Sequence, residues 1–512
     1  MRRCERTNTG LNETIKAFLK RHHLLDGNSP GWEIRQSDTG GFGVFATRDF
    51  DVGEVVFKDF PVIIGPRCIQ KCPRICVCCF SKENLRICTS GCGLELCSQS
   101  CQNSSSHHRE CKTVRKYLEL NANFLEQFNQ ELFENLTPIR SLFLDEIDKE
   151  VVSCLIAHDR DDHGREIDTL KEKLGFKFNE LDEQFLKFVC CVMDANAFEV
   201  ALGNERCQSS VRGLYPLSSL ANHSCVPNIS HVFNSKHEMV VKAAVFIPKN
   251  SELFHCYTRL IWGSTIRLFH LHKTKHFVCK CPRCKDPTEF GTFVNSILCK
   301  LCGGPVCPVN PYKAYANWQC QHCKNITTGL EIEPITTLLG QLIRIWLPFL
   351  QVNWISAGSI LKGVESSDFP FMYNLLNGKL KSVVPQYNQV AVELKWKIVW
   401  VLGHKPGYTW SELTLDQLKI KEDICIDLLN LLEKLQCGQC KMRGLLLYEL
   451  FCCKREGINR LNGTKYVVDP HKLSALLHEA IKILEHDVTA PQEIKNCSSS
   501  TNGWNLRLRD WD

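Results

Sequence analysis

The stretch Leu220-Ala221-Asn222-His223-Ser224-Cys225-Val226-Pro227-Asn228 decides how the rest of the chain is interpreted, together with a tyrosine that follows it, Tyr257. An Asn-His-Ser-Cys run carries little information alone. Its meaning comes from cysteines that gather before and after it at metal-ligand spacings, and from a glycine pair far upstream, Gly41 and Gly43. These features together predict a specific site.

Composition describes a soluble globular protein, with 44% hydrophobic and 23% charged residues. Since 512 residues exceed what one hydrophobic core usually supports, we expect about two to four domains. The net charge of +6 is modest and spread along the chain, so we expect no direct nucleic-acid binding. The most apolar segment, residues 336–362, contains Arg344 and Pro348, which argues against a membrane span.

Cysteine is the compositional outlier, with 31 residues. The N-terminal stretch lacks an apolar core, so we expect no secretory signal. Without a route to an oxidising compartment, the cysteines are interpreted as metal ligands and buried thiols rather than as disulfides. The expected location is the nucleus, the cytoplasm or both.

Strand-like runs cover residues 32–48 and 54–64 and are divided by a turn at Asp51-Val52-Gly53. Gly41-Phe42-Gly43 lies between two such strands and precedes no helix, so it is not a dinucleotide-binding fingerprint. It is either a plain turn or a place where the backbone approaches a ligand closely.

From Cys68 onward, four ligand pairs follow in close succession, enough for two tetrahedral Zn²⁺ ions. Interleaved pairing assigns Cys76, Cys79, Cys97 and Cys101 to one ion, and Cys88, Cys92, His107 and Cys111 to the other. His108 is an alternative to His107, and Cys68, Cys72 and Cys78 are bystanders.

A third site follows from Cys279, Cys281 and Cys284, which lack a fourth ligand nearby. Cys225 is the natural fourth, making a Cys₄ site whose metal ties this segment to the central stretch.

A fourth site is predicted from Cys299 and Cys302, followed by Cys320 and Cys323, at the spacing of a zinc ribbon. Cys307 is then a bystander.

The remaining segments alternate between helical and strand-like patterns. Residues 113–200 have helical periodicity, and strand-like runs return at His231–Phe233, Met239–Ile247 and Glu252–Tyr257. An interrupted β domain, resumed after a zinc module and a helical insertion, accounts for this order. Helical patterns fill the rest of the chain, where Cys437, Cys440, Cys452 and Cys453 are interpreted as buried thiols inside helices.

In this order, Gly41-Phe42-Gly43, the zinc module, Asn222-His223-Ser224-Cys225, Tyr257 and the Cys279 triplet closely resemble the SET and MYND domain-containing (SMYD) lysine methyltransferases. The extra ribbon resembles the arthropod-type branch. The resemblance implies an α+β multidomain fold, divided as follows: N-terminal helical segment 1–29, first SET part 30–67, MYND-type zinc finger 68–112, helical insertion 113–200, core SET 201–273, post-SET zinc site 274–290, zinc ribbon 291–330 and TPR-like helical domain 331–512.

The resemblance also implies S-adenosylmethionine (AdoMet) as methyl donor and about four Zn²⁺ per chain. It assigns AdoMet contacts to Gly41, Phe42, Gly43, Asn196, Asn222, His223 and Phe277. Tyr257 is implied to be catalytic, and Phe198 with Tyr257 to line the lysine channel. Asn250-Ser251-Glu252 stands where the family commonly has Gly-Glu-Glu.

The function implied is protein-lysine N-methylation of histone or non-histone proteins, with a role in chromatin regulation. The MYND-type finger is implied to recruit proline-rich peptides or co-repressors, and the protein to be a monomer. The alternative from another class is a catalytically weak or inactive scaffold, a transcriptional co-repressor that keeps the SET fold as structure. Fold resemblance alone does not separate the two.

Overall fold

A computed structural model describes residues 8–25, 30–68, 72–117, 128–157, 164–203, 209–313, 315–344, 368–461 and 469–499. These residues divide into two compact units. The first comprises Met1–Asn222, His231–Leu253 and Glu485–Asp512, and the second His223–Ser230 and Phe254–Leu484. The chain therefore passes from one unit to the other within the Asn222-His223 motif. The segments predicted over 1–29, 113–200, 336–362 and 331–512 each lie partly outside the described residues.

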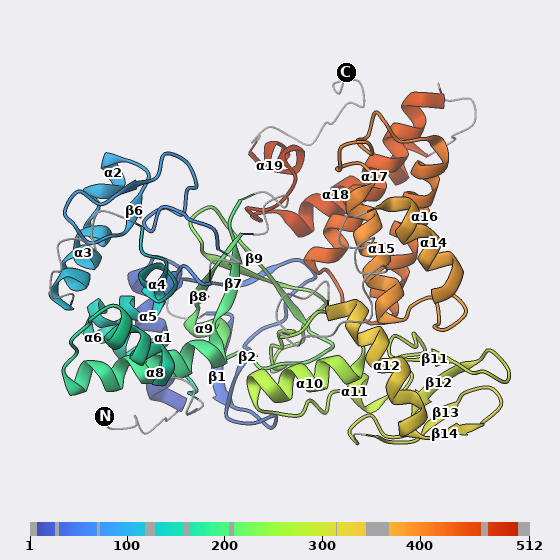
Figure 1. The fold of residues 1–512 in the computed structure, drawn as a ribbon, viewed down its shortest axis with the longest axis horizontal. Helices are drawn as coiled ribbons and strands as arrows, with labels where there is room; N and C mark the ends of the chain where they lie inside the picture. The colour runs from blue at the N-terminus through green and yellow to red at the C-terminus, as the bar shows by residue number, and fades with distance from the viewer. Residues whose placement is uncertain are drawn as a thin grey trace. The chain divides into compact units, whose positions relative to one another are not determined.

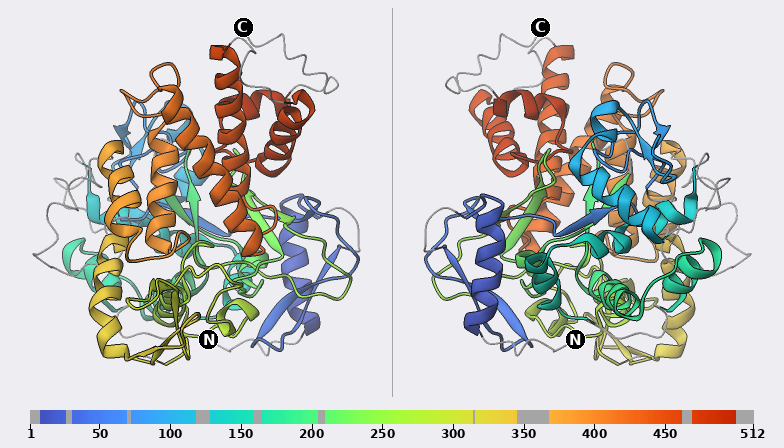
Figure 2. Two further views of the ribbon diagram at one scale, coloured as in Figure 1. Left: turned by 90° about the vertical axis from the view of Figure 1, so that its right-hand side faces the viewer. Right: turned by 90° about the vertical axis from the view of Figure 1, so that its left-hand side faces the viewer.

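A helix and a hairpin open the first unit. The helix α1 (Asn8–Arg21) buries Leu11, Ile15, Phe18 and Leu19, as its periodicity predicts. It lies against β1 (Trp32–Gln36), seen in dark blue in Figure 2, where Asn12 Nδ2 donates to the Ile34 carbonyl over 2.7 Å. β1 pairs with β2 (Phe42–Ala46) in antiparallel register. The turn between them uses φ values of +121° at Gly40 and +64° at Gly41, a region that favours glycine.

Two three-stranded sheets follow in this unit. Their orders are β3-β10-β9 and β4-β8-β7. The strands are β3 (Val55–Asp59), β4 (Ile63–Gly65), β7 (Phe198–Ala201), β8 (Ser210–Leu214), β9 (Ile229–Phe233) and β10 (Met239–Ala243). The pattern did not predict β8, because Arg212 and Gly213 interrupt its apolar run.

The expectation of a strand over Glu252–Tyr257 is wrong. Only isolated bridges form there, Phe45 with Glu252 in one unit and His223 with His255 in the other. The unit boundary between Leu253 and Phe254 divides this segment. Alternating side chains alone do not reveal that a segment changes partners halfway along.

A cysteine-rich module and a helical insertion separate β4 from β7. The elements are β5 (Arg86–Ile87), β6 (Glu95–Leu96), α2 (Gln99–Gln102), α3 (Ser105–Tyr117), α4 (Gln130–Glu134), α5 (Leu136–Ile139), η2 (Arg140–Phe143), α6 (Glu146–Ser153), α7 (Gly164–Asp168), η4 (Thr169–Lys173) and α8 (Glu180–Asn196). Helices account for most of the described residues of the segment predicted as a helical insertion, 113–200. The helical part ends at Asn196 rather than residue 200, since Phe198–Ala201 pairs with β8.

The second unit combines a small sheet with a helical array. Its sheet has the order β11-β12-β13-β14. Helices α15 to α18 pack in succession, each against the next (Figures 1 and 2). The elements are α10 (Ser264–Lys275), α11 (Pro282–Lys285), β11 (Ile297–Leu298), β12 (Pro305–Pro308), β13 (Trp318–Cys320), β14 (Ile326–Thr327), α12 (Gly329–Arg344), α14 (Phe369–Leu375), η5 (Leu376–Leu380), α15 (Gln389–Val401), α16 (Leu415–Lys434), α17 (Lys441–Leu461) and α18 (Pro470–Leu484); α19 (Gln492–Ser499) belongs to the first unit.

One apolar face of α16 packs into the core of this array. Its residues Ile424, Leu428 and Leu432 are buried, whereas Ile426 is exposed. Among the described helices, none has the length and apolar character needed to cross a lipid bilayer.

Asp59, at the end of β3, holds the backbone segment that precedes the Asn-His motif. Its side chain is fully buried, and its Oδ2 accepts the Ser218 N–H over 2.7 Å in α9 (Pro216–Ser219). Burial raises the pKa of Asp59 to about 7. A protonated carboxyl is therefore favoured in the folded state below neutral pH.

We expect Asp59 to make stability fall as pH rises from about 5 to about 8. In this window the unfolded carboxyl, with an ordinary pKa of 3.8, has lost its proton, whereas the folded one gives it up only near its raised pKa. Asp59→Asn cannot titrate, so its melting temperature should fall less between these pH values than that of the wild type. The exposed Asp51→Asn serves as control, and identical pH dependence in all three proteins would contradict the prediction.

Candidate functional site

The four predicted ligand sets each converge in the structure. The groups are Cys76, Cys79, Cys97 and Cys101; Cys88, Cys92, His107 and Cys111; Cys225, Cys279, Cys281 and Cys284; and Cys299, Cys302, Cys320 and Cys323. Within each group the ligand atoms all lie within 4.8 Å of one another. The interleaved pairing of the first two sets is confirmed, and His107 rather than His108 belongs to its cluster.

The spacing of the sulfur atoms fits zinc. Tetrahedral zinc–thiolate geometry places neighbouring sulfurs about 3.8 Å apart. The Cys299–Cys323 pair is separated by 3.8 Å, Cys302–Cys320 by 3.5 Å and Cys97–Cys101 by 3.6 Å. No described cysteine is disulfide-bonded, so the donor sets are available as thiolates. Zn²⁺ is therefore the cofactor that these four clusters fit.

The cysteines interpreted as bystanders lie outside the clusters. Cys307 contacts Ser296 Oγ at 3.1 Å. The buried-thiol interpretation also fits Cys437, Cys440, Cys452 and Cys453, which are all buried. However, Cys437 and Cys440 lie in the turn between α16 and α17 rather than inside a helix, because the left-handed Gln436 ends α16. Burial raises the pKa of both thiols.

In the first unit, Asn222 joins a small polar network. Its Nδ2 donates to Glu252 Oε1 over 2.7 Å and to the Phe42 carbonyl over 3.1 Å. Ser37 Oγ donates to the same carboxylate over 2.8 Å. The glycine-containing hairpin and the Asn-His motif are thus connected through the Phe42 carbonyl and the Glu252 carboxylate. Glu252 and Ser37 were not predicted as site residues. Glu252 offered a signal, because it matches the last glutamate of the Gly-Glu-Glu pattern that the family commonly has.

Position 43 has no room for a side chain in this structure. A Cβ atom at this position would lie 2.3 Å from Glu252 Oε1 and 3.1 Å from Asn222 Nδ2. Such separations are far below van der Waals contact, so any side chain would displace the carboxylate. This observation supports close backbone approach over a plain turn for Gly43.

Two other predicted site residues of the first unit, Asn196 and Phe198, contact residues outside the network around Asn222. Asn196 Nδ2 donates to the carbonyls of Ile156 and Val192, both over 2.7 Å. Phe198 packs edge-on against Tyr215, with ring centroids 5.9 Å apart, and against His231 at 5.5 Å. Tyr215 and His231 were not identified from the sequence, because no motif marks them.

In the second unit, His223, Tyr257 and Phe277 come together. The Tyr257 N–H donates to His223 Nδ1 over 2.9 Å. The His223 ring lies 5.2 Å from the Tyr257 ring and 5.8 Å from the Phe277 ring, measured between centroids. Ser224 N donates to the His255 carbonyl over 2.9 Å, which holds the two segments side by side.

Electrostatics keep His223 uncharged. The ring is buried, and burial lowers its pKa to about 3. A neutral imidazole that accepts a hydrogen bond at Nδ1 carries its proton at Nε2. Because protonation at Nδ1 would break the bond to the tyrosine backbone, the neutral ring and the position of Tyr257 depend on each other.

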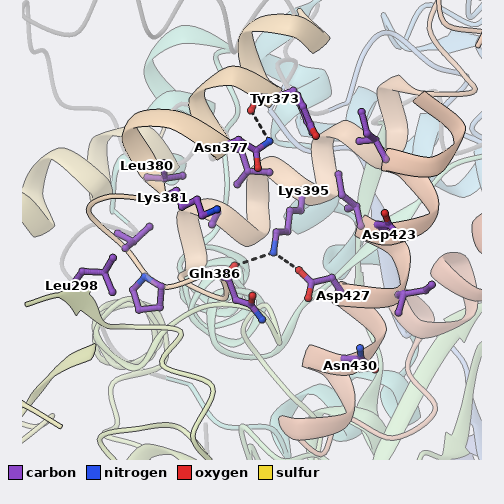
Figure 3. Close-up of a pocket in the computed structure, with 17 residues that line it drawn as sticks. Leu298, Tyr373, Asn377, Leu380, Lys381, Gln386, Lys395, Asp423, Asp427 and Asn430 are labelled. Atoms are coloured by element: carbon purple, nitrogen blue, oxygen red, sulfur yellow. Dashed lines mark hydrogen bonds and ion pairs between the residues drawn. The ribbon is translucent and has the colours of Figure 1, made fainter. Parts of the chain in front are cut away.

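A cavity of about 650 Å³ lies elsewhere, within the helical part of the second unit (Figure 3). Its walls come mainly from η5, α15, α16 and the segment between η5 and α15, with Leu298 of β11 and Tyr373 of α14. Lys395 extends across it to Asp427 and to the Gln386 carbonyl. None of its lining residues belongs to a zinc cluster or to the groups around Asn222 and Tyr257.

Comparison with known proteins places these features in a family. A family model described as the SET domain matches residues 41–258. The SET domain-containing protein SmydA-8, isoform B, of Drosophila melanogaster is 28% identical over 431 residues, covering 82% of this chain and 91% of that protein. Histone-lysine N-methyltransferase SMYD3 of Homo sapiens is 28% identical over 265 residues, covering 48% of this chain and 59% of that protein.

The matched SET domain includes Gly41 to Gly43, the Asn222-His223 motif and Tyr257. The similarity to SmydA-8 extends over most of both chains. The resemblance predicted from the motifs is supported: the chain contains a SET domain and is similar to SET and MYND domain-containing (SMYD) proteins.

Proposed function

We propose that this chain is an AdoMet-dependent protein-lysine N-methyltransferase that acts on histone or non-histone proteins. Similar curated proteins are named histone-lysine N-methyltransferases, among them SMYD3 of Homo sapiens and ASHR1 of Arabidopsis thaliana. The observation that carries the proposal is the fixed position of Tyr257. Its N–H is held by a buried neutral histidine, and that histidine adjoins Asn222 in the chain.

The cofactor contacts assigned from the motifs belong to the same proposal. We propose that Gly41, Phe42 and Gly43 supply backbone contacts and that Asn196, Asn222 and His223 hold the polar groups. Phe277 would stack on the adenine. The crowding at Gly43 fits this assignment, because a ligand held by backbone atoms requires a residue without a side chain. When bound, AdoMet supplies an electrophilic methyl group on a sulfonium.

The residues of the chain then align and desolvate the substrate amine. Phe198, with Tyr215 and His231 beside it, would form an aromatic wall that excludes water and lowers the pKa of the incoming lysine, favouring its neutral form. The Tyr257 hydroxyl would orient the amine for in-line displacement. The nitrogen would gain the methyl group as the carbon–sulfur bond breaks and a neutral thioether leaves, and it would then release a proton to solvent.

The finer architecture belongs to the same proposal. We assign a split SET fold to residues 30–67 and 201–273, interrupted by a MYND finger at 68–112 and the helical insertion. The post-SET site at 274–290, the ribbon at 291–330 and a TPR-like domain would follow. The finger would recruit proline-rich partners, and the four clusters would each bind one Zn²⁺ through the residues named above.

Replacing Tyr257 by Phe tests the activity. With labelled AdoMet and a panel of histones and cell-extract proteins, the wild type should label at least one substrate. Tyr257→Phe should lose about 10²-fold or more of that rate, the scale expected for removal of one positioned hydroxyl. Its affinity for AdoMet, measured by calorimetry, should stay within about twofold. Equal background labelling by both proteins would instead favour the inactive scaffold.

Gly43→Ala tests the cofactor assignment. The added methyl group displaces the end of the Glu252 side chain, which is flexible, so the protein should still fold. The Asn222 amide then loses one of its two acceptors, the Glu252 carboxylate, and AdoMet affinity should fall about tenfold, corresponding to the loss of one hydrogen bond of roughly 1.4 kcal/mol. Gly340→Ala, which meets no neighbour within 4 Å, is the matched control. Unchanged affinity of the Gly43 variant would refute its role.

Metal analysis tests the ligand assignments. The wild type should contain about four zinc ions per chain, one for each cluster. Cys225→Ser should lose one ion and weaken AdoMet binding, because its site adjoins His223. Cys307→Ser should retain both properties. A wild-type content near two ions, measured by elemental analysis, would remove two of the four assignments.

A further inference from the structure

A buried ion-pair network adjoins the cluster of Cys225, Cys279, Cys281 and Cys284, and it comprises Arg267, Arg283 and Glu289. Arg267 extends from α10, Arg283 from α11 and Glu289 from the segment after α11, elements that Figure 1 places next to one another. All three side chains are 0% exposed. Burying three charges is costly unless every hydrogen-bonding group is satisfied. The partners of these three side chains therefore show which groups the network holds in place.

Toward the metal cluster, Arg267 is the residue of the network that donates hydrogen bonds to sulfur. Its Nε lies 3.1 Å from Cys225 Sγ, and its Nη2 lies 3.4 Å from Cys284 Sγ. Four thiolates around Zn²⁺ leave a net charge of about −2 in a buried site. A guanidinium that donates to two of the sulfurs offsets that charge and lowers the basicity of the thiolates.

Toward the catalytic segment, the network holds the backbone that follows Tyr257. Arg283 donates to the Leu260 carbonyl over 2.6 Å and to the Trp262 carbonyl over 2.7 Å. Arg267 also donates to the Trp262 carbonyl. Three donors are therefore directed at two carbonyls of one short turn.

Glu289 connects the two arginines. Its Oε2 accepts from Arg267 over 2.6 Å and from Arg283 over 2.9 Å. Its Oε1 accepts the backbone N–H of Ser264 over 2.7 Å, at the first residue of α10. The carboxylate thus orients both guanidinium groups and also fixes the end of the same turn.

From these contacts we infer that Arg267, Glu289 and Arg283 are positioning residues that couple zinc retention at the Cys225 cluster to the order of the segment carrying Tyr257. The zinc part of this inference is independent of the proposed activity, whereas the meaning of the Tyr257 segment for catalysis rests on it. The coupling is geometric. The two guanidinium groups donate to the sulfurs and to the two carbonyls, and the carboxylate that orients them also accepts the Ser264 amide, so a shift at one end displaces the other.

Conservative variants of the full-length, zinc-loaded protein test the coupling. Arg267→Lys keeps the positive charge but loses the planar fork that reaches several partners. Glu289→Gln keeps the shape but loses the charge. Lys273→Met, on the exposed face of the same helix α10, is the matched control.

The first readout is zinc transfer to a chromogenic chelator. Arg267→Lys and Glu289→Gln should release one zinc ion about 10- to 100-fold faster than the wild type, the range found for residues that support metal ligands. The other ions should leave at wild-type rates. The second readout is backbone hydrogen exchange of residues 257–264, which should rise in both variants and stay unchanged in Lys273→Met.

Neither readout requires methyl transfer, so an inactive wild type would leave this test intact. Wild-type zinc release or wild-type exchange at 257–264 in both variants would overturn the inference. Increased exchange throughout the second unit would also overturn it, because the network would then be a general element of stability. Faster release of one zinc ion, together with an increase in hydrogen exchange that is confined to residues 257–264, would support it.

Discussion

The hydrogen bond from the Tyr257 backbone to His223 Nδ1, 2.9 Å long, is the interaction on which the site depends. It exists only while the imidazole is neutral, and the ring is neutral because burial disfavours its charged form. His223 is bonded to Asn222 on one side and lies two positions before Cys225 on the other. One short stretch of backbone therefore has to satisfy an amide network, an aromatic cluster and a metal cluster.

Metal clusters supply much of the rigidity that such a stretch needs. The Cys225 cluster joins the Asn-His motif to the segment that carries Phe277, and the adjacent Arg267 and Arg283 extend that connection to the turn after Tyr257. Glu289, fully buried between the two arginines, orients both. A site that must align a tyrosine within a few tenths of an ångström benefits from ordered neighbours rather than from flexible loops.

The first unit contributes a different kind of constraint. The Glu252 carboxylate, held by Ser37 and Asn222, occupies the space beside Gly43 that a side chain would otherwise fill. Asp59 has a comparable role in the same unit, where its buried carboxyl accepts the Ser218 N–H just before the motif. The Glu252 and Asp59 carboxyl groups thus help to position the backbone at Gly43 and at Ser218, respectively.

The sequence alone determined which cysteines and histidine cluster, because their spacings follow from the geometry of tetrahedral coordination within short loops. It also predicted the helical array, the early strands and the family, which depend on local periodicity and on ordered motifs. Tertiary structure alone decided the partners of those motifs. Glu252, Tyr215 and the Arg267–Glu289–Arg283 network are recognisable only once residues far apart in the chain meet, and the segment over Glu252–Tyr257 divides between two units. Side-chain alternation records which face of a segment is buried, but not which neighbour buries it.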